Sequence, residues 1–166
     1  MNAAIRAYAE TDRAAVIEAL TALQEHERAL HDTRVPGATS TAAYLAQLQQ
    51  RLTAQSGAMF ISEAEGRFLG LVAGLIVDEP WPTETGDSTR YGYVSDIFLA
   101  PEARGAGLTQ VLLDAIADHL HRADPTLRRL RVNALAVNRI ALRAYEKAGF
   151  TPYEVVYERR LGPARS

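Results

Sequence analysis

One stretch, Tyr91–Leu120, most constrains how this chain can fold. It joins an aromatic and β-branched run, Tyr93–Leu99, to a basic turn with two glycines and then to a periodic apolar segment. The run predicts a strand, and Pro101 ends regular pairing because proline has no backbone N–H. Apolar residues then recur at helical spacing from Leu108 to Leu120 and predict an amphipathic helix. A strand, a tight turn and a helix are therefore expected in immediate succession.

The turn has the composition of an anion-binding loop, Arg104-Gly105-Ala106-Gly107. The first N–H groups of a helix lack internal partners, and the helix dipole adds partial positive charge there. Glycines let the backbone bend and come close to a ligand. Such a turn can hold phosphate oxygens, although the same residues also suit a tight connection that binds nothing.

Two familiar phosphate loops do not fit this turn. No Gly-Lys-Ser/Thr follows it, which excludes the P-loop of nucleotide-hydrolysing enzymes. Gln110 stands where the dinucleotide-binding fingerprint requires its third glycine. If the turn binds phosphate, it does so within another architecture.

The composition predicts a single domain over residues 1–166. Hydrophobic residues make up 48% of the chain, enough for a sizeable core, and the formal net charge of −2 offers no basic excess for nucleic acid. The absence of cysteine excludes a disulfide framework, a thiolate metal site and a cysteine nucleophile. With no leader-like start and no run of ~20 apolar residues, we expect a cytoplasmic protein without a membrane partner.

The rest of the chain predicts alternating helices and strands. The expected strands are Ala4–Tyr8, Ala58–Ala64, Phe68–Val77, Leu130–Leu135 and Tyr153–Leu161. The expected helices run from Thr11 or Asp12 to about His31, from Thr39, Ser40 or Thr41 to about Gln55, and from Asn138 to Ala148. Asp78–Arg90 is polar, holds two prolines and predicts a long loop. This order predicts a mixed sheet with helices on both faces.

A second chemical pattern lies in the last predicted helix. Asn138 opens this helix, Tyr145 follows seven residues later, and Gly149-Phe150 ends it. Asparagine is a good helix N-cap, and a tyrosine at this place can simply pack with its hydroxyl at the rim. Taken singly, both residues have these plain structural interpretations.

Together, the two patterns resemble motifs A and B of the GNAT superfamily, the acyl-CoA-dependent N-acetyltransferases. Motif A is Arg/Gln-x-x-Gly-x-Gly/Ala after a strand and a Pro-acidic pair. Arg104, Gly107 and Pro101-Glu102 match it, whereas Thr109 stands where Gly or Ala is usual. The helix that begins at Asn138 matches motif B, and the resemblance covers nearly the whole chain.

The resemblance implies an α/β fold with a mixed sheet of six to seven strands flanked by four helices. Its parallel central strands, here Val94–Leu99 and Leu130–Leu135, would splay apart. It also implies acetyl-CoA as co-substrate and no metal. The residues implied to bind acetyl-CoA are Ile97, Phe98, Leu99, Arg104, Gly105, Ala106, Gly107, Leu108, Thr109 and Asn138.

The implied reaction is direct attack of a primary amine on the acetyl thioester while both substrates are bound. The acceptor would be a small amine, a polyamine, an amino acid or a lysine side chain. By resemblance, Tyr145 protonates the departing thiolate. Asp96 is the candidate base, because Tyr93-Val94-Ser95-Asp96 partly shows the Tyr-x-acid-acid pattern of the polyamine branch. Asp96 is equally interpretable as a structural carboxylate that caps the turn.

The candidate acceptor-binding residues do not belong to a recognisable sequence motif. Glu25, His26 and Glu27 on the first helix could hold a cationic amine, but such residues also form solvated helix faces. Trp81 could line the acceptor site or a subunit contact. Tyr153–Arg160 alternates like an exposed sheet edge that needs cover, and the family often pairs through its last strands, so a homodimer is expected.

Two other functions remain open from the sequence. Thr109 in the turn and Ser95 in place of an acid are compatible with a non-catalytic CoA-binding sensor or interaction module. A structural α/β domain without a ligand is the third possibility.

Overall fold

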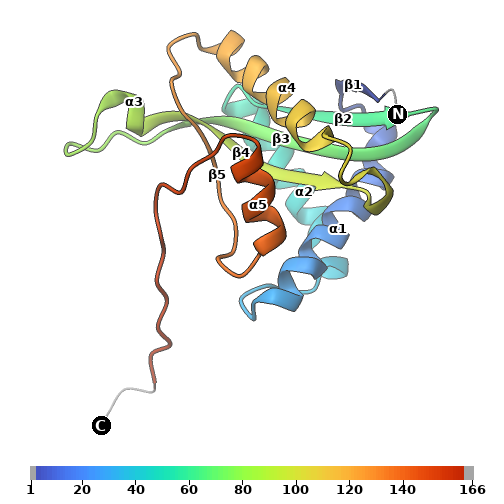
Figure 1. The fold of residues 1–166 in the computed structure, drawn as a ribbon, viewed down its shortest axis with the longest axis horizontal. Coiled ribbons are helices and arrows are strands. Elements are labelled where there is room, and N and C mark those ends of the chain that lie inside the picture. The colour runs from blue at the N-terminus through green and yellow to red at the C-terminus, as the bar shows by residue number, and fades with distance from the viewer. Residues whose placement is uncertain (1–2, 163–166) are drawn as a thin grey trace.

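Five strands form one mixed sheet in the order β1-β2-β3-β4-β5 in the computed structural model, which describes residues 3–162 (Figure 1). Neighbouring strands are antiparallel except β4 and β5, which are parallel. The strands are β1 (Ala4–Ala7), β2 (Ala58–Ala64), β3 (Arg67–Asp78), β4 (Arg90–Leu99) and β5 (Leu130–Val132).

Helices cover both faces of the sheet. The helices are α1 (Arg13–Leu30), α2 (Gly37–Ala54), α3 (Gly86–Thr89), α4 (Leu108–Ala123) and α5 (Arg139–Lys147), with short 3-10 turns η1 (Glu10–Asp12) and η2 (Pro101–Ala103). One core forms where α1 and α2 pack on the sheet, around Leu45 and Leu71. A second forms under α4, around Val72 and Ile116. None of the helices within residues 3–162 has the length and apolar character needed to cross a bilayer.

The burial of the central strand β3 on both faces explains why its sequence is a continuous apolar run. Every residue from Leu69 to Val77 is buried, because α1 and α2 cover one face and α4 covers the other. Gly74 lies under α4, where a Cβ would come within 2.7 Å of Ile116 Cγ1. The glycine therefore lets α4 pack closely on the sheet.

Within residues 3–162, the structure corrects the expected numbers of elements to five strands and five helices. The additional helix, α3, is a single turn inside the segment expected to be a loop. Its N-cap is Thr85, whose carbonyl accepts from the N–H groups of Ser88 and Thr89. The expected strand Leu130–Leu135 forms only over its first three residues.

The expected last strand, Tyr153–Leu161, is wrong as a strand of this chain's own sheet. These residues have neither helical nor strand structure, and the chain leaves the body of the protein after α5 (Figure 1). The alternating sequence satisfies the local requirement of a strand. A strand also needs a hydrogen-bonded neighbour, and this segment pairs with no strand in residues 3–162.

Candidate active site

A β-bulge at Ser95, in the pairing of β4 with β3, lies next to the point where β4 stops pairing with β5. Asp96 lies opposite Ala73 of β3 while Val94 lies opposite the next residue, so Ser95 is the additional residue. Its hydroxyl donates to the carbonyl of Ala73 at 3.2 Å. Because a bulge bends its strand and increases the twist, β5 pairs with β4 only as far as Val94. The two parallel strands therefore stop pairing beside the bulge, at the place where the resemblance implies that they diverge.

The turn after β4 presents a row of free backbone donors. Within residues 3–162, no acceptor receives the N–H groups of residues 105–109. Gly105 and Gly107 have φ angles of 81° and 78°, which favour glycine. A Cβ at either position would meet nothing within 4 Å, so the turn faces open space. These donors and the start of α4 together form an anion-binding geometry.

Both ends of this turn are fixed to the core. Ala103 and Leu108 are 1% and 7% exposed, and they anchor the segment before and after the glycines. The exposed Arg104 folds back, and its Nε donates to the carbonyl of Leu99 at 3.3 Å. Its guanidinium is therefore held at the end of β4, in the residue that directly precedes the free amides. Thr109 lies in the first turn of α4.

Helix α5 is capped at both ends, and this positions Tyr145. Asn138 is buried, and its Oδ1 accepts from the N–H of Ala141 at 3.1 Å, which confirms its N-cap role. Gly149 has a φ of 85°, and the N–H of Phe150 donates to the carbonyl of Tyr145 at 3.0 Å. This is a Schellman C-cap. The rings of Tyr145 and Phe150 pack with centroids 5.9 Å apart.

The phenol of Tyr145 lies near acidic and aromatic groups from two other elements, α1 and β4. The pKa of Tyr145 is raised to about 12, chiefly by burial and also by the nearby charges of Glu27, Tyr93 and Asp96. The hydroxyl therefore stays protonated throughout the neutral range and is available as a proton donor. Tyr145 and Asp96, which lie far apart in the sequence, are thus brought to the same region.

Asp96 is a buried carboxylate held by a tyrosine. It is 8% exposed, and the hydroxyl of Tyr44 donates to its Oδ2 at 2.7 Å. Burial raises the pKa of Asp96, with a smaller opposing effect from the hydrogen bonds of Tyr44 and Ser95. A raised pKa makes the carboxylate a stronger base. The carboxylate bonds to a side chain of α2, not to the turn after β4.

The two acidic residues expected on α1 have different surroundings. Glu25 accepts from the N–H of Gly37 at 2.6 Å and thereby caps α2, which lowers its pKa. Glu27 pairs with Arg34 at 2.6 Å and still contributes negative charge at Asp96, Tyr93 and Tyr145. Glu25 has a structural role, whereas Glu27 faces the site.

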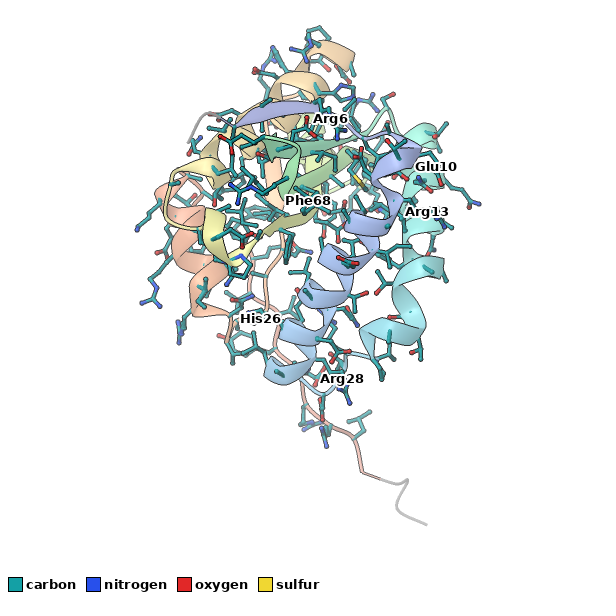
Figure 2. All side chains as sticks on the ribbon, turned by 90° about the vertical axis from the view of Figure 1, so that its right-hand side faces the viewer. Arg6, Glu10, Arg13, His26, Arg28 and Phe68 are labelled. Carbon is teal, nitrogen blue, oxygen red and sulfur yellow. The ribbon has the colours of Figure 1, made fainter. Side chains whose placement is uncertain are left out.

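The other two candidate acceptor-binding residues, His26 and Trp81, lie in other parts of the molecule. Figure 2 shows His26 on the flank of α1 that faces away from α2. Trp81 is 64% exposed in the loop before α3. Figure 1 shows α3 and the turn after β4 at opposite ends of the sheet. The structure therefore does not bring Trp81 to Asp96.

Sequence reasoning missed Tyr44. Its helical spacing with Leu45, Leu48 and Leu52 placed it on the apolar face of α2, where an aromatic residue needs no further explanation. The residue that it contacts, Asp96, is 52 positions away. No local pattern connects α2 with β4, so only the packing of the two elements shows the pair.

A family model described as the acetyltransferase (GNAT) family matches residues 20–150. The chain belongs to this family. Its GNAT membership agrees with the strand, turn and helix order around the open turn and with the capped helix that carries Tyr145. No curated protein matches this GNAT chain by sequence.

Solved structures share the fold of this GNAT protein at low identity. A mutant of the BH1408 protein from Bacillus halodurans has 17% identity and a TM-score of 0.80 over 95% of this chain and 99% of that chain. An aminoglycoside 6'-N-acetyltransferase from Acinetobacter haemolyticus has 18% identity and a TM-score of 0.69, covering 97% and 99%. A predicted acetyltransferase from Clostridium acetobutylicum, solved with acetyl-CoA, has 18% identity and a TM-score of 0.68, covering 96% of each chain.

Proposed function

We propose that this GNAT protein transfers an acetyl group from acetyl-CoA to a primary amine, by direct attack with both substrates bound. The observation that carries the proposal is the open row of donors at residues 105–109, which follows η2 after the strand that holds Asp96. Family membership and a structural neighbour solved with acetyl-CoA support the co-substrate.

In this proposal, different residues of the chain have separate roles in the reaction. Acetyl-CoA supplies an activated acetyl thioester. The turn binds the diphosphate through its backbone amides, and residues 97–99 offer the free edge of β4 to the pantetheine arm. Asp96 accepts a proton from the acceptor amine, whose pKa of about 10 keeps it mostly protonated in neutral solution. Tyr145 donates the proton that the departing thiolate needs.

The charges around Asp96 favour a cationic acceptor. Asp96 and Glu27 supply negative charge, which Arg34 and Arg51 offset in part, and Tyr44 and Tyr93 add aromatic rings in the same region. Carboxylates attract an ammonium group through charge, and tyrosine faces attract it through their electron density. Polyamines, aminosugars and lysine side chains carry such groups. A structural neighbour acts on aminoglycosides, which are polycationic amines.

A non-catalytic CoA-binding module is the competing proposal. Two residues motivate it: Thr109 in the turn, where Gly or Ala is usual, and Ser95, which stands where an acid is common. In the structure the hydroxyl of Ser95 bonds to β3 within the bulge, and the following residue supplies a buried carboxylate with a raised pKa. These features support the catalytic proposal.

A thiol-release assay with acetyl-CoA and a panel of amines tests the proposal. Because the chain has no cysteine, the thiol reagent reacts only with the product. We expect thiol release with at least one of putrescine, spermidine, glucosamine and a lysine-containing peptide. The matching acetylated amine should form at the same time. The alcohols of the same chain length are the control. Tight acetyl-CoA binding without turnover on any amine would instead support the non-catalytic module.

A further inference from the structure

The hydroxyl of Tyr44 occupies one oxygen of the Asp96 carboxylate. The bond runs from α2 to β4, with 2.7 Å between Tyr44 Oη and Asp96 Oδ2. Burial, followed by the charge of Asp96, raises the pKa of Tyr44, so its hydroxyl keeps the proton that it donates throughout the neutral range. The second oxygen, Oδ1, is the one that can receive a proton from a substrate.

Contacts with α1 fix the part of α2 that carries Tyr44. Thr41, one turn before Tyr44, is buried, and its hydroxyl donates to the carbonyl of Gly37 at 2.7 Å. The hydroxyl of Thr21 in α1 donates to Thr41 Oγ1 at 3.1 Å. At Gly37, a Cβ would come within 2.9 Å of the carbonyl oxygen of Thr21, so the two helices are in close contact. The position of the Tyr44 hydroxyl is therefore set by the packing of α1 and α2.

The bond from Tyr44 is the strongest contact that favours the charged form of Asp96. Burial raises the pKa of Asp96, and the Tyr44 bond is the largest of the effects that lower it, followed by Ser95. The charge of Glu27 raises this pKa and that of Arg51 lowers it, each by less than the Tyr44 bond. The ionisable groups near Asp96 on the neighbouring elements are Glu27 of α1, Arg51 of α2, Tyr93 of β4 and Tyr145 of α5.

We propose that Tyr44 is a positioning residue for Asp96: its hydroxyl holds Oδ2, favours the ionised carboxylate and leaves Oδ1 for the proton of the acceptor amine. This role rests on the proposed function, in which Asp96 is the base. A general base has to be ionised and within hydrogen-bond reach of the proton. A buried carboxylate without a donor favours its neutral form, and a misplacement of ~1 Å slows a reaction strongly. The bond from Tyr44 opposes both losses.

The variant Tyr44→Phe removes the hydroxyl and keeps the ring. We expect its kcat/KM in the thiol-release assay to fall about tenfold at pH 6 and less than about threefold at pH 9, because the carboxylate then ionises only at higher pH. Tyr8→Phe is the matched control, since the hydroxyl of Tyr8 donates to Glu10 at 3.0 Å in an exposed tyrosine–carboxylate pair. Its pH profile should be that of the wild-type protein. A loss of equal size at every pH would overturn the proposal.

A double-mutant cycle with Asp96→Asn tests whether Tyr44 acts through Asp96. Once the base is removed, Tyr44→Phe should change the residual kcat/KM at pH 6 less than about twofold, although it costs about tenfold when Asp96 is present. If the bond merely holds α2 against the sheet, the losses of the two single variants should multiply. Multiplied losses would overturn the proposal.

Carbon NMR of protein labelled at the aspartate carboxyl groups follows the ionisation of Asp96 without turnover. The Asp96→Asn spectrum assigns its signal. We expect the titration midpoint of Asp96 to move to higher pH in Tyr44→Phe and to stay unchanged in Tyr8→Phe. An unmoved midpoint in a protein that acetylates amines would overturn the role of Tyr44 alone. A moved midpoint in a protein that acetylates no amine would overturn the proposed function, while the effect of Tyr44 on the charge of Asp96 would stand.

Discussion

Replacing Tyr145 with Phe is expected to lower kcat about 100-fold, while the dissociation constant of acetyl-CoA changes less than twofold. The magnitude is that of a lost general acid. Burial raises the pKa of this phenol to about 12, so the hydroxyl is a proton donor throughout the working pH range. Phe keeps the ring that packs on Phe150, and the fold should therefore be preserved.

Tyr91→Phe is the matched control for this variant. Tyr91 lies in β4, and its ring packs under the guanidinium of Arg131 at 4.1 Å, a contact that Phe retains. Its kcat should stay near that of the wild-type protein. Wild-type turnover in the Tyr145 variant, measured by thiol release, would remove this residue from the mechanism.

Asp96→Asn is expected to lower kcat/KM about 100-fold by removing the base, and at the same time to raise the melting temperature at neutral pH. Burial raises the pKa of Asp96, so the folded state favours the neutral carboxyl. The stability associated with that form is fully present below the ordinary pKa of about 4 and is lost as the pH rises through the folded-state pKa. The neutral amide avoids this loss and still accepts the hydrogen bond from Tyr44.

The difference in melting temperature between the Asn variant and the wild-type protein should therefore be largest near pH 7 and disappear near pH 4. Residual activity of the variant should rise with pH toward the pKa of the free amine, since no enzyme group removes the proton. Calorimetry and a pH–rate profile measure the two effects. A variant that is both fully active and no more stable would show that Asp96 is neither the base nor a buried charge.

The local parts of this site could be predicted from the sequence because their signals lie within a few residues. Pro101 after a β-branched run, glycines before an apolar helix, and Asn138 seven residues before Tyr145 each specify a backbone path by themselves. The structure has the strand, the turn and the capped helix at these positions.

The remaining features depend on contacts between distant segments. Tyr44 of α2 meets Asp96 of β4 through a hydrogen bond between residues 52 positions apart. The length of β5 depends on the bulge at Ser95, for which the sequence has no separate signal. Residue character alternates over Tyr153–Leu161 as it does in a strand. Alternation does not say which sheet edge, or which chain, supplies the neighbouring strand.

The measurement that tests the central claim most directly is the dissociation constant of acetyl-CoA for Gly107→Ala and Gly66→Ala, by titration calorimetry. Both glycines have left-handed backbone, with φ of 78° and 72°, and a Cβ at either would meet nothing within 4 Å. Each substitution therefore costs a similar strain of about 1–2 kcal/mol. If the amides of residues 105–109 bind the diphosphate, Gly107→Ala weakens binding at least tenfold and Gly66→Ala, in the β2–β3 turn, leaves it unchanged. Wild-type affinity in both variants would contradict the account.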